Sequence, residues 1–197
     1  EIVNLRAILA LPKGTEYFLS DLHGEYDAFQ YFVRSASGTI KMKIDENFGT
    51  ILSATDREQL AALIYDPVNE LKRREAAEDD FNAWCSSAIY RLIIICRAVS
   101  NKYTRSKVRR ILPDNTGYIM DERMFADDDD NRQKYYQEII DSVIEFRIAK
   151  TLIIEIANTI SDLAVDHLHI IGDIFDRGPK PHKIMDFLMS RRSVDIQ

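Results

Sequence analysis

The chain has 197 residues, 46% of them hydrophobic, and a formal net charge of −6. This length can bury a substantial core in one or two domains, and the acidic balance argues against a nucleic-acid-binding surface, which needs a basic face. The strongest apolar run, Leu92–Cys96, is interrupted by Arg91 and Arg97. We therefore expect no segment that spans a membrane, and no signal or transit segment is visible.

The predicted elements begin with a strand over 16–22, which is rich in aromatic residues, and a helix over 25–35. The stretch 37–48 is polar and contains glycine, so we expect a loop or a short strand there, which could form a mobile cover near the site. The sequence Thr55–Glu58 is typical of a capping box and predicts a short helix that ends near Pro67.

Helical spacing continues over 68–102. A short helix is predicted over 105–112, and a long amphipathic helix over 133–163 has apolar residues mostly at steps of three and four. The two longest helices can bury their apolar stripes against each other as an antiparallel hairpin. Their remaining apolar residues could also offer a face to a second subunit, so a homo-oligomer through this helical part is one expectation.

A second strand is predicted over 166–172, followed by a helix over 179–192. We expect the two strands to be parallel neighbours with a right-handed crossover, because their polar ends must meet at one edge of the sheet. The fold class is therefore α/β: a partial sheet with flanking helices that carries a large all-helical insertion. The expected divisions are a first part of the core over 1–38, the insertion over 39–163 and a second part of the core over 164–197.

Metal-ligating residue types lie at the ends of both strands. Asp21 and His23 are two residues apart, so in an extended backbone both side chains would leave on the same face and reach one cation. Asp173 follows Gly172, whose missing side chain lets metal and phosphate approach the backbone. Two divalent ions about 3.5–4 Å apart at such a site could activate a water and hold phosphoryl oxygens.

The motifs Asp21-x-His23 and Gly172-Asp173-x-x-Asp176-Arg177-Gly178 resemble those of the calcineurin-like metallophosphoesterase superfamily. Here the gap between them is 173 − 23 = 150 residues, much longer than one crossover helix. With its flanks Tyr17–Tyr26 and Ile170–Pro179, this long helical insertion resembles the class III fructose-1,6-bisphosphatases of bacteria, and the resemblance covers essentially the whole chain.

The resemblance implies roles for five residues. Asp21 and His23 would ligate the first metal, Asp173 would bridge two metals, Asp176 would orient a histidine or a water, and Arg177 would clamp the substrate phosphate. An alternative for Asp176 and Arg177 is a local ion pair that shapes the following turn. A site of carboxylates and one imidazole suits manganese or magnesium, and the sequence does not distinguish between them.

The implied reaction is hydrolysis of the 1-phosphate of fructose 1,6-bisphosphate to fructose 6-phosphate and phosphate, which serves gluconeogenesis. This superfamily completes its site with a Gly-Asn-His segment and two later histidines, which these residues lack. The chain also begins at Glu1, and Ser193–Gln197 reads as the opening of the next strand. We therefore expect an internal part of a longer enzyme, with at most three of the metal ligands and little turnover by itself.

Two other functions stay open. A phosphoprotein or dinucleotide phosphatase of the same superfamily would share every ligand named above. A non-catalytic module, whose long helices bind a partner in an assembly, would not depend on Asp173 at all. The expected partner for the enzyme is a small sugar phosphate, with neither nucleic acid nor membrane.

Several other residues have ordinary structural interpretations. His167 and His169 lie toward the start of the second strand, and His182 lies in the first turn of the next helix, so we expect sheet or helix contacts rather than metal ligation. Basic runs at Lys72–Arg74 and Arg105–Arg110 are interpreted as solvated helix faces, with an acidic partner or an anionic effector as the alternative. The run Asp127–Asp130 is interpreted as stabilising a helix start rather than as a metal site. Cys85 and Cys96 are expected in one helix, too far apart to bond to each other, and so as reduced thiols of a cytoplasmic protein.

Overall fold

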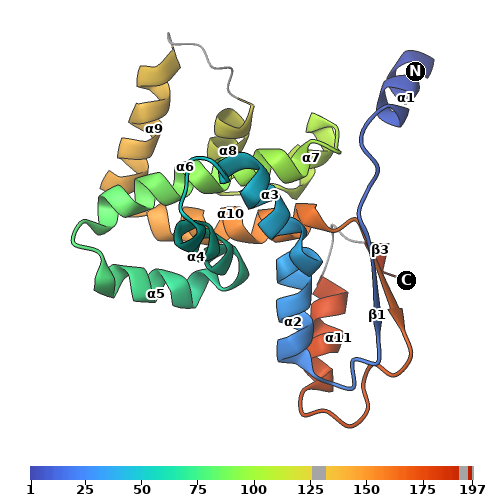
Figure 1. The fold of residues 1–197 in the computed structure, drawn as a ribbon. Coiled ribbons are helices and arrows are strands. Elements are labelled where there is room, and N and C mark those ends of the chain that lie inside the picture. Colours follow the sequence, from blue (N-terminus) through green and yellow to red (C-terminus); the bar gives the residue numbers. More distant parts are fainter. Residues whose placement is uncertain (126–131, 191–194, 197) are drawn as a thin grey trace.

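A computed structural model describes residues 1–125, 132–190 and 195–196 of the chain. A bundle of helices carries a small parallel sheet at one end, and the short first helix lies beyond the start of the sheet (Figure 1). The elements in chain order are α1 Ile2–Leu9, β1 Glu16–Ser20, α2 Tyr26–Ser35, η1 Ala36–Gly38, α3 Thr39–Phe48, α4 Ala54–Tyr65, α5 Pro67–Ala77, α6 Phe81–Ser100, α7 Arg105–Ile111, α8 Gly117–Met124, α9 Gln133–Glu145, α10 Ala149–Ala164, β2 His167–Ile171, α11 Pro181–Ser190 and β3 Asp195–Ile196.

The described strands form a parallel sheet in the order β1-β2-β3. Glu16 pairs with His167 and Ser20 with Ile171, so β1 and β2 run in register over their whole length. Helices α2 and α11 pack on one face of this sheet, where Phe29 and its apolar neighbours form a small core (Figure 1). The predicted pair of parallel neighbouring strands is therefore confirmed, and β3 lies within the segment interpreted as the opening of the next strand.

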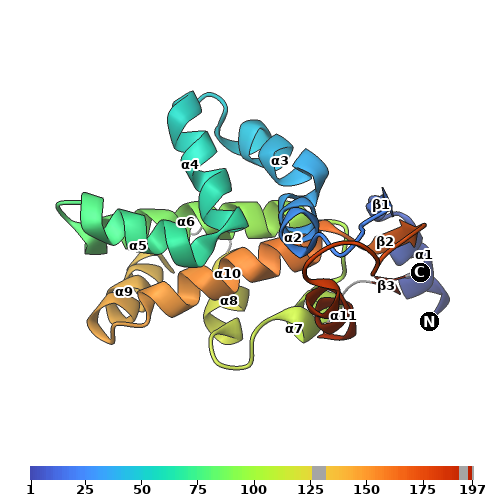
Figure 2. The same ribbon diagram turned by 90° about the horizontal axis from the view of Figure 1, so that it is seen from below.

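The helical bundle is organised around α6 and α10, which lie side by side (Figure 2). Lys150, at the start of α10, lies 5.5 Å from the ring centroid of Phe81 at the start of α6. At the other end, the Lys102 ammonium donates to the carbonyl oxygen of Ala164 at 3.2 Å. The two helices therefore run parallel, and the predicted antiparallel hairpin is wrong. After α6, the helices α7, α8 and α9 lead the chain back to the end of the bundle where α6 begins. Helix α10 therefore starts beside the start of α6 and runs in the same direction, whereas a short hairpin loop would have made the two helices antiparallel.

Other expectations for the helical part are also corrected. The stretch 37–48 is not a loop or a strand, because α3 buries Ile40, Ile44 and Phe48 at intervals of four residues in the main core. The single helix predicted over 68–102 is two helices, α5 and α6, and Asp80 caps the second by accepting a hydrogen bond from the amide of Ala83. Helix α8 was not predicted at all.

The long helix predicted over 133–163 is also divided, into α9 and α10. Arg147, between them, has φ of 58°, a left-handed conformation that no helix can continue through. The N-cap of α4 lies two residues earlier than the predicted capping box. Ser53, rather than Thr55, accepts the hydrogen bond from the amide of Asp56. The Asp127–Asp130 run lies outside the described residues, as do the last two residues of the helix predicted over 179–192.

Helix α6 has 20 residues and is long and apolar enough to span a membrane by length and composition, contrary to the expectation from the flanking arginines. In the structure it is the central helix of the bundle, and nine of its residues are buried against neighbouring helices. Such burial is typical of the core helix of a water-soluble domain. Cys85 and Cys96 are both free and buried in it, as expected, and burial raises their pKa values to about 11 and about 12.

A polar cluster joins the helical bundle to the sheet. The Lys102 ammonium donates to the Asp166 carboxylate at 2.5 Å, to the Thr15 hydroxyl at 3.1 Å and to the carbonyl of Ala164. Asp166 also accepts a hydrogen bond from the amide of Thr15 at 2.7 Å. Thr15 and Asp166 immediately precede β1 and β2, so one buried ammonium, with its three hydrogens used, holds the starts of both strands at the end of the bundle.

Candidate metal centre

The candidate metal centre lies where β1 and β2 end. Backbone hydrogen bonds continue between the segments that follow the two strands. The amide of Asp21 donates to the carbonyl oxygen of Ile171 at 3.1 Å, and the amide of His23 donates to that of Asp173 at 3.0 Å. Segments far apart in sequence are thus held side by side by the backbone before any side chain contributes.

Both segments turn through left-handed backbone conformations. φ is 51° at Asp21 and 46° at His23 in the first segment, and 60° at Arg177 in the second. The prediction that an extended backbone places Asp21 and His23 on one face is therefore wrong, because β1 ends at Ser20 and the chain turns at each of these two residues. Non-glycine residues adopt this conformation at a cost of roughly 1–2 kcal/mol each, and such strain clusters at functional sites.

Two glycines let the segments approach closely. A Cβ added to Gly172 would lie 2.4 Å from Oδ1 of Asp21, so the bare backbone leaves room for that carboxylate. A Cβ added to Gly178 would lie 1.9 Å from the carbonyl oxygen of His23. A side chain at Gly178 would require one segment to move, whereas a side chain at Gly172 would displace the Asp21 carboxylate. The Asp21 carboxylate lies close to the backbone at Gly172, and the approach of metal or phosphate expected there stays a prediction.

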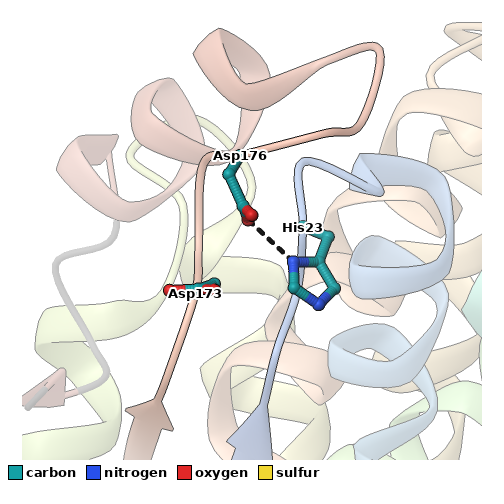
Figure 3. Close-up of side chains that lie close together, drawn as sticks. All are labelled: His23, Asp173 and Asp176. Atoms are coloured by element: carbon teal, nitrogen blue, oxygen red, sulfur yellow. Dashed lines mark hydrogen bonds and ion pairs between the residues drawn. The ribbon is translucent and has the colours of Figure 1, made fainter.

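His23, Asp173 and Asp176 lie close together, with the Asp176 carboxylate directed at the His23 ring (Figure 3). Each offers one ligand atom, and the three atoms all lie within 4.8 Å of one another. All three side chains are at least partly exposed, so an ion could reach them from solvent. Of the sequence-predicted metal ligands, the structure brings together His23 and Asp173, and it adds Asp176, which was expected in a supporting role.

The contact between His23 and Asp176 is a hydrogen bond of 2.7 Å between Nδ1 and Oδ1 (Figure 3). This hydrogen bond holds the pKa of the Asp176 carboxyl below its ordinary value, and the nearby Arg177 guanidinium acts in the same direction. With Nδ1 engaged, Nε2 is the ring nitrogen left to bind a cation, an arrangement common among metal-binding histidines.

Asp21 and Arg177 lie at the edge of this group. Oδ1 of Asp21 accepts a hydrogen bond from the amide of Asp173 at 3.4 Å, so its carboxylate lies against the second segment without joining the three-residue group. Nε of Arg177 lies 3.1 Å from Oδ2 of Asp176, which is the local ion pair considered as an alternative. The Arg177 side chain is 76% exposed, so that ion pair is weak and screened by solvent.

Sequence reasoning assigned no role to Lys180, which secures the second segment. Its ammonium donates to the Asp27 carboxylate at 2.6 Å, and its amide donates to the carbonyl of Gly24 at 3.2 Å. No sequence pattern distinguishes this lysine from a surface residue. His169 stacks on Phe18 with ring centroids 4.5 Å apart, the sheet contact that was expected of it.

The donor set fits a hard or borderline divalent cation. It combines carboxylate oxygens with one imidazole, which suit manganese and magnesium, whereas soft ions prefer thiolates. Both cysteines are buried in the helical bundle, and neither belongs to the group of candidate ligands.

A family model described as Firmicute fructose-1,6-bisphosphatase matches residues 1–197, the whole chain. The chain belongs to this family. A class 3 fructose-1,6-bisphosphatase of Clostridium tetani is 50% identical over the whole chain, and one of Clostridium botulinum strain Hall is 48% identical. The chain spans 30% of the length of each of these relatives. No solved structure matches it.

Proposed function

We propose that these residues supply one part of the active site of a metal-dependent fructose-1,6-bisphosphatase. The observation that carries the proposal is that the family match covers the whole chain and the segments after β1 and β2 bring a histidine and two carboxylates to one point. The reaction would be hydrolysis of the 1-phosphate of fructose 1,6-bisphosphate to fructose 6-phosphate and phosphate, in gluconeogenesis. The sugar phosphate is the proposed partner and the cytoplasm the proposed location.

Two side chains would hold the cation directly. Nε2 of His23 is free to bind it while Asp176 fixes the imidazole ring, and Asp173 presents its carboxylate beside that ring. Asp21, against the backbone of Asp173, would be a further ligand after a small rotation of its side chain. A divalent cation, manganese or magnesium, would supply activation of water and neutralisation of phosphoryl oxygens at this point.

Arg177 would bind the substrate phosphate. A guanidinium can form two parallel hydrogen bonds to phosphoryl oxygens, and this side chain is exposed at the edge of the group. Its ion pair with Asp176 would weaken as a phosphate took its place. Asp176 would then serve chiefly to hold the Nδ1 proton of His23, so that the nitrogen facing the cation stays unprotonated.

The proposed architecture is a metallophosphoesterase core divided by an insertion. Residues 1–38 and 164–197 would form two parts of the core, and residues 39–163 the helical insertion. The small parallel sheet with helices on one face and the separate apolar core of the bundle support this division. A homo-oligomer formed through the insertion is part of the same proposal.

The test is manganese-dependent phosphate release from fructose 1,6-bisphosphate by the complete enzyme and by its Asp173→Asn variant. Asp79→Asn, an exposed position between α5 and α6, is the matched control. We expect Asp173→Asn to lower kcat/KM by at least a hundredfold and Asp79→Asn to leave it unchanged.

Other outcomes would replace the proposal. Faster turnover of a phosphopeptide or a dinucleotide than of the sugar bisphosphate would keep the metal centre and change the substrate. Full activity in Asp173→Asn would contradict an active site at this position and favour a non-catalytic module.

A further inference from the structure

We propose that the helical insertion binds a small organic anion with an apolar body, in a cavity between α3, α6, α8 and α9. The cavity has a volume of about 610 Å³, within the range of small-molecule sites. None of its lining residues belongs to the segments that carry His23, Asp173 and Asp176. The inference concerns binding alone and does not depend on the proposed reaction.

The charge of the lining points to an anion. Arg91 and Arg123 line the cavity, and no aspartate or glutamate does so among the residues that the structure describes. This contrasts with the net charge of −6 and with other arginines of the bundle, such as Arg74, which is paired with two glutamates. Neither cavity arginine has a carboxylate within 4.0 Å in the described part of the chain. Arg91 also lines a neighbouring small space shared with Asp56, which makes Arg123 the better-placed cation.

Arg123 is held ready for a ligand. Its guanidinium lies over the ring of Tyr136, 4.7 Å from the centroid, and that tyrosine is only 3% exposed. A cation–π contact fixes the plane of the guanidinium against one face and leaves its N–H edges able to donate. An oxyanion in the cavity could therefore form charge-assisted hydrogen bonds without a large rearrangement of the arginine.

The apolar part of the lining sets the second property of the ligand. Phe48 and Ile140 line the cavity, together with Ile51 and Tyr90, which are 73% and 56% exposed. Large apolar side chains that gather at a concave surface are typical of ligand sites, because a ligand there removes them from water. Carboxamides of Asn47, Gln133 and Gln137 complete the lining with neutral hydrogen-bonding groups.

The test uses two fluorescent probes of nearly equal shape and different charge. The anion 8-anilinonaphthalene-1-sulfonate is titrated into the complete protein, and N-phenyl-1-naphthylamine, which lacks the sulfonate, is the matched neutral probe. Variants are Arg123→Gln, Ser87→Trp, which places a bulky ring in the cavity, and the control Arg97→Gln, an exposed arginine of α6 outside the cavity. Circular dichroism establishes that each variant is folded.

We expect saturable binding of the sulfonate probe. Its dissociation constant should rise about tenfold in Arg123→Gln, as for loss of one charge-assisted hydrogen bond. The increase in Ser87→Trp should be similar or larger. Arg97→Gln should leave it unchanged. The proposal is overturned by an absence of saturable binding, by equal affinity for the neutral probe, or by unchanged affinity in the folded Arg123→Gln and Ser87→Trp variants.

Discussion

Removing the Lys102 ammonium should destabilise the protein strongly, because Asp166 would stay buried without its cation. Both side chains are only 8% exposed. Loss of one partner from a buried ion pair costs about 3–5 kcal/mol. Asp166 keeps its hydrogen bond from the amide of Thr15, so we place the cost of Lys102→Met at the lower end of this range, about 3 kcal/mol. For a chain of this length this corresponds to a fall in Tm of about 6–12 °C.

The assay is urea unfolding followed by far-ultraviolet circular dichroism, with the m-value compared between variants. Lys72→Met, an exposed lysine of α5, is the control and should change the free energy of unfolding by less than about 0.5 kcal/mol. The double variant Lys102→Met/Asp166→Asn buries no charge and should recover about 1 kcal/mol or more. A loss below about 0.5 kcal/mol in Lys102→Met would refute the reasoning that this contact joins the bundle to the sheet.

Three further predictions concern acid stability, the metal centre and the thiols. Burial alone would raise the pKa of Asp166, but hydrogen bonds from Lys102 and its neighbours hold it below its ordinary value. The ionised Asp166 should therefore contribute fully to stability above the carboxyl pKa of the unfolded chain, about 4. This contribution should disappear as pH falls through the lower pKa that Asp166 has in the folded protein. Between pH 7 and pH 2, the urea midpoint should therefore fall less for Asp166→Asn than for the original protein. Gly178→Ala should weaken manganese binding by the complete enzyme at least about tenfold, because its methyl group would collide with the facing segment. At Gly38 a Cβ meets nothing within 4 Å but φ is 90°, so Gly38→Ala should lower stability through backbone strain and leave manganese binding unchanged. Equal affinities of Gly178→Ala and the original enzyme in calorimetry would contradict the role of Gly178. Buried thiols with raised pKa values should react with a disulfide reagent at pH 8 only as the protein unfolds, so rapid native labelling of Cys85 or Cys96 would be inconsistent with the structure.

The two main strands and the cluster of polar residues at their ends were predictable, because short stretches of sequence indicate both. Each strand is a short apolar run followed by candidate metal ligands, and parallel strands bring such ends to one edge of a sheet. That logic placed Asp173 near His23 across a long gap in sequence. The same reasoning could not predict the backbone turns at Asp21 and His23. Left-handed conformations are uncommon at these residue types, and here they accompany hydrogen bonds to the other segment.

The helical part was less predictable for a different physical reason. Apolar spacing continues across the breaks near Asp80 and Arg147, and neither break contains the glycine or proline that usually ends a helix. In α3, lysines and acidic residues hid the spacing of Ile40, Ile44 and Phe48. The parallel direction of α6 and α10 follows from where three intervening helices lead the chain, which the periodicity of either helix does not contain.

The beginning and end of the helical bundle lie next to each other. The hydroxyl of Ser161, near the end of α10, donates to the carbonyl oxygen of Arg34 near the end of α2 at 3.3 Å. Tyr17, in β1, donates its hydroxyl to the carbonyl of Ala36. A segment whose two ends meet can be gained, lost or exchanged as one genetic unit while the strands beside it stay in place. The bundle could therefore diversify in evolution independently of the short sequences that carry the candidate metal ligands.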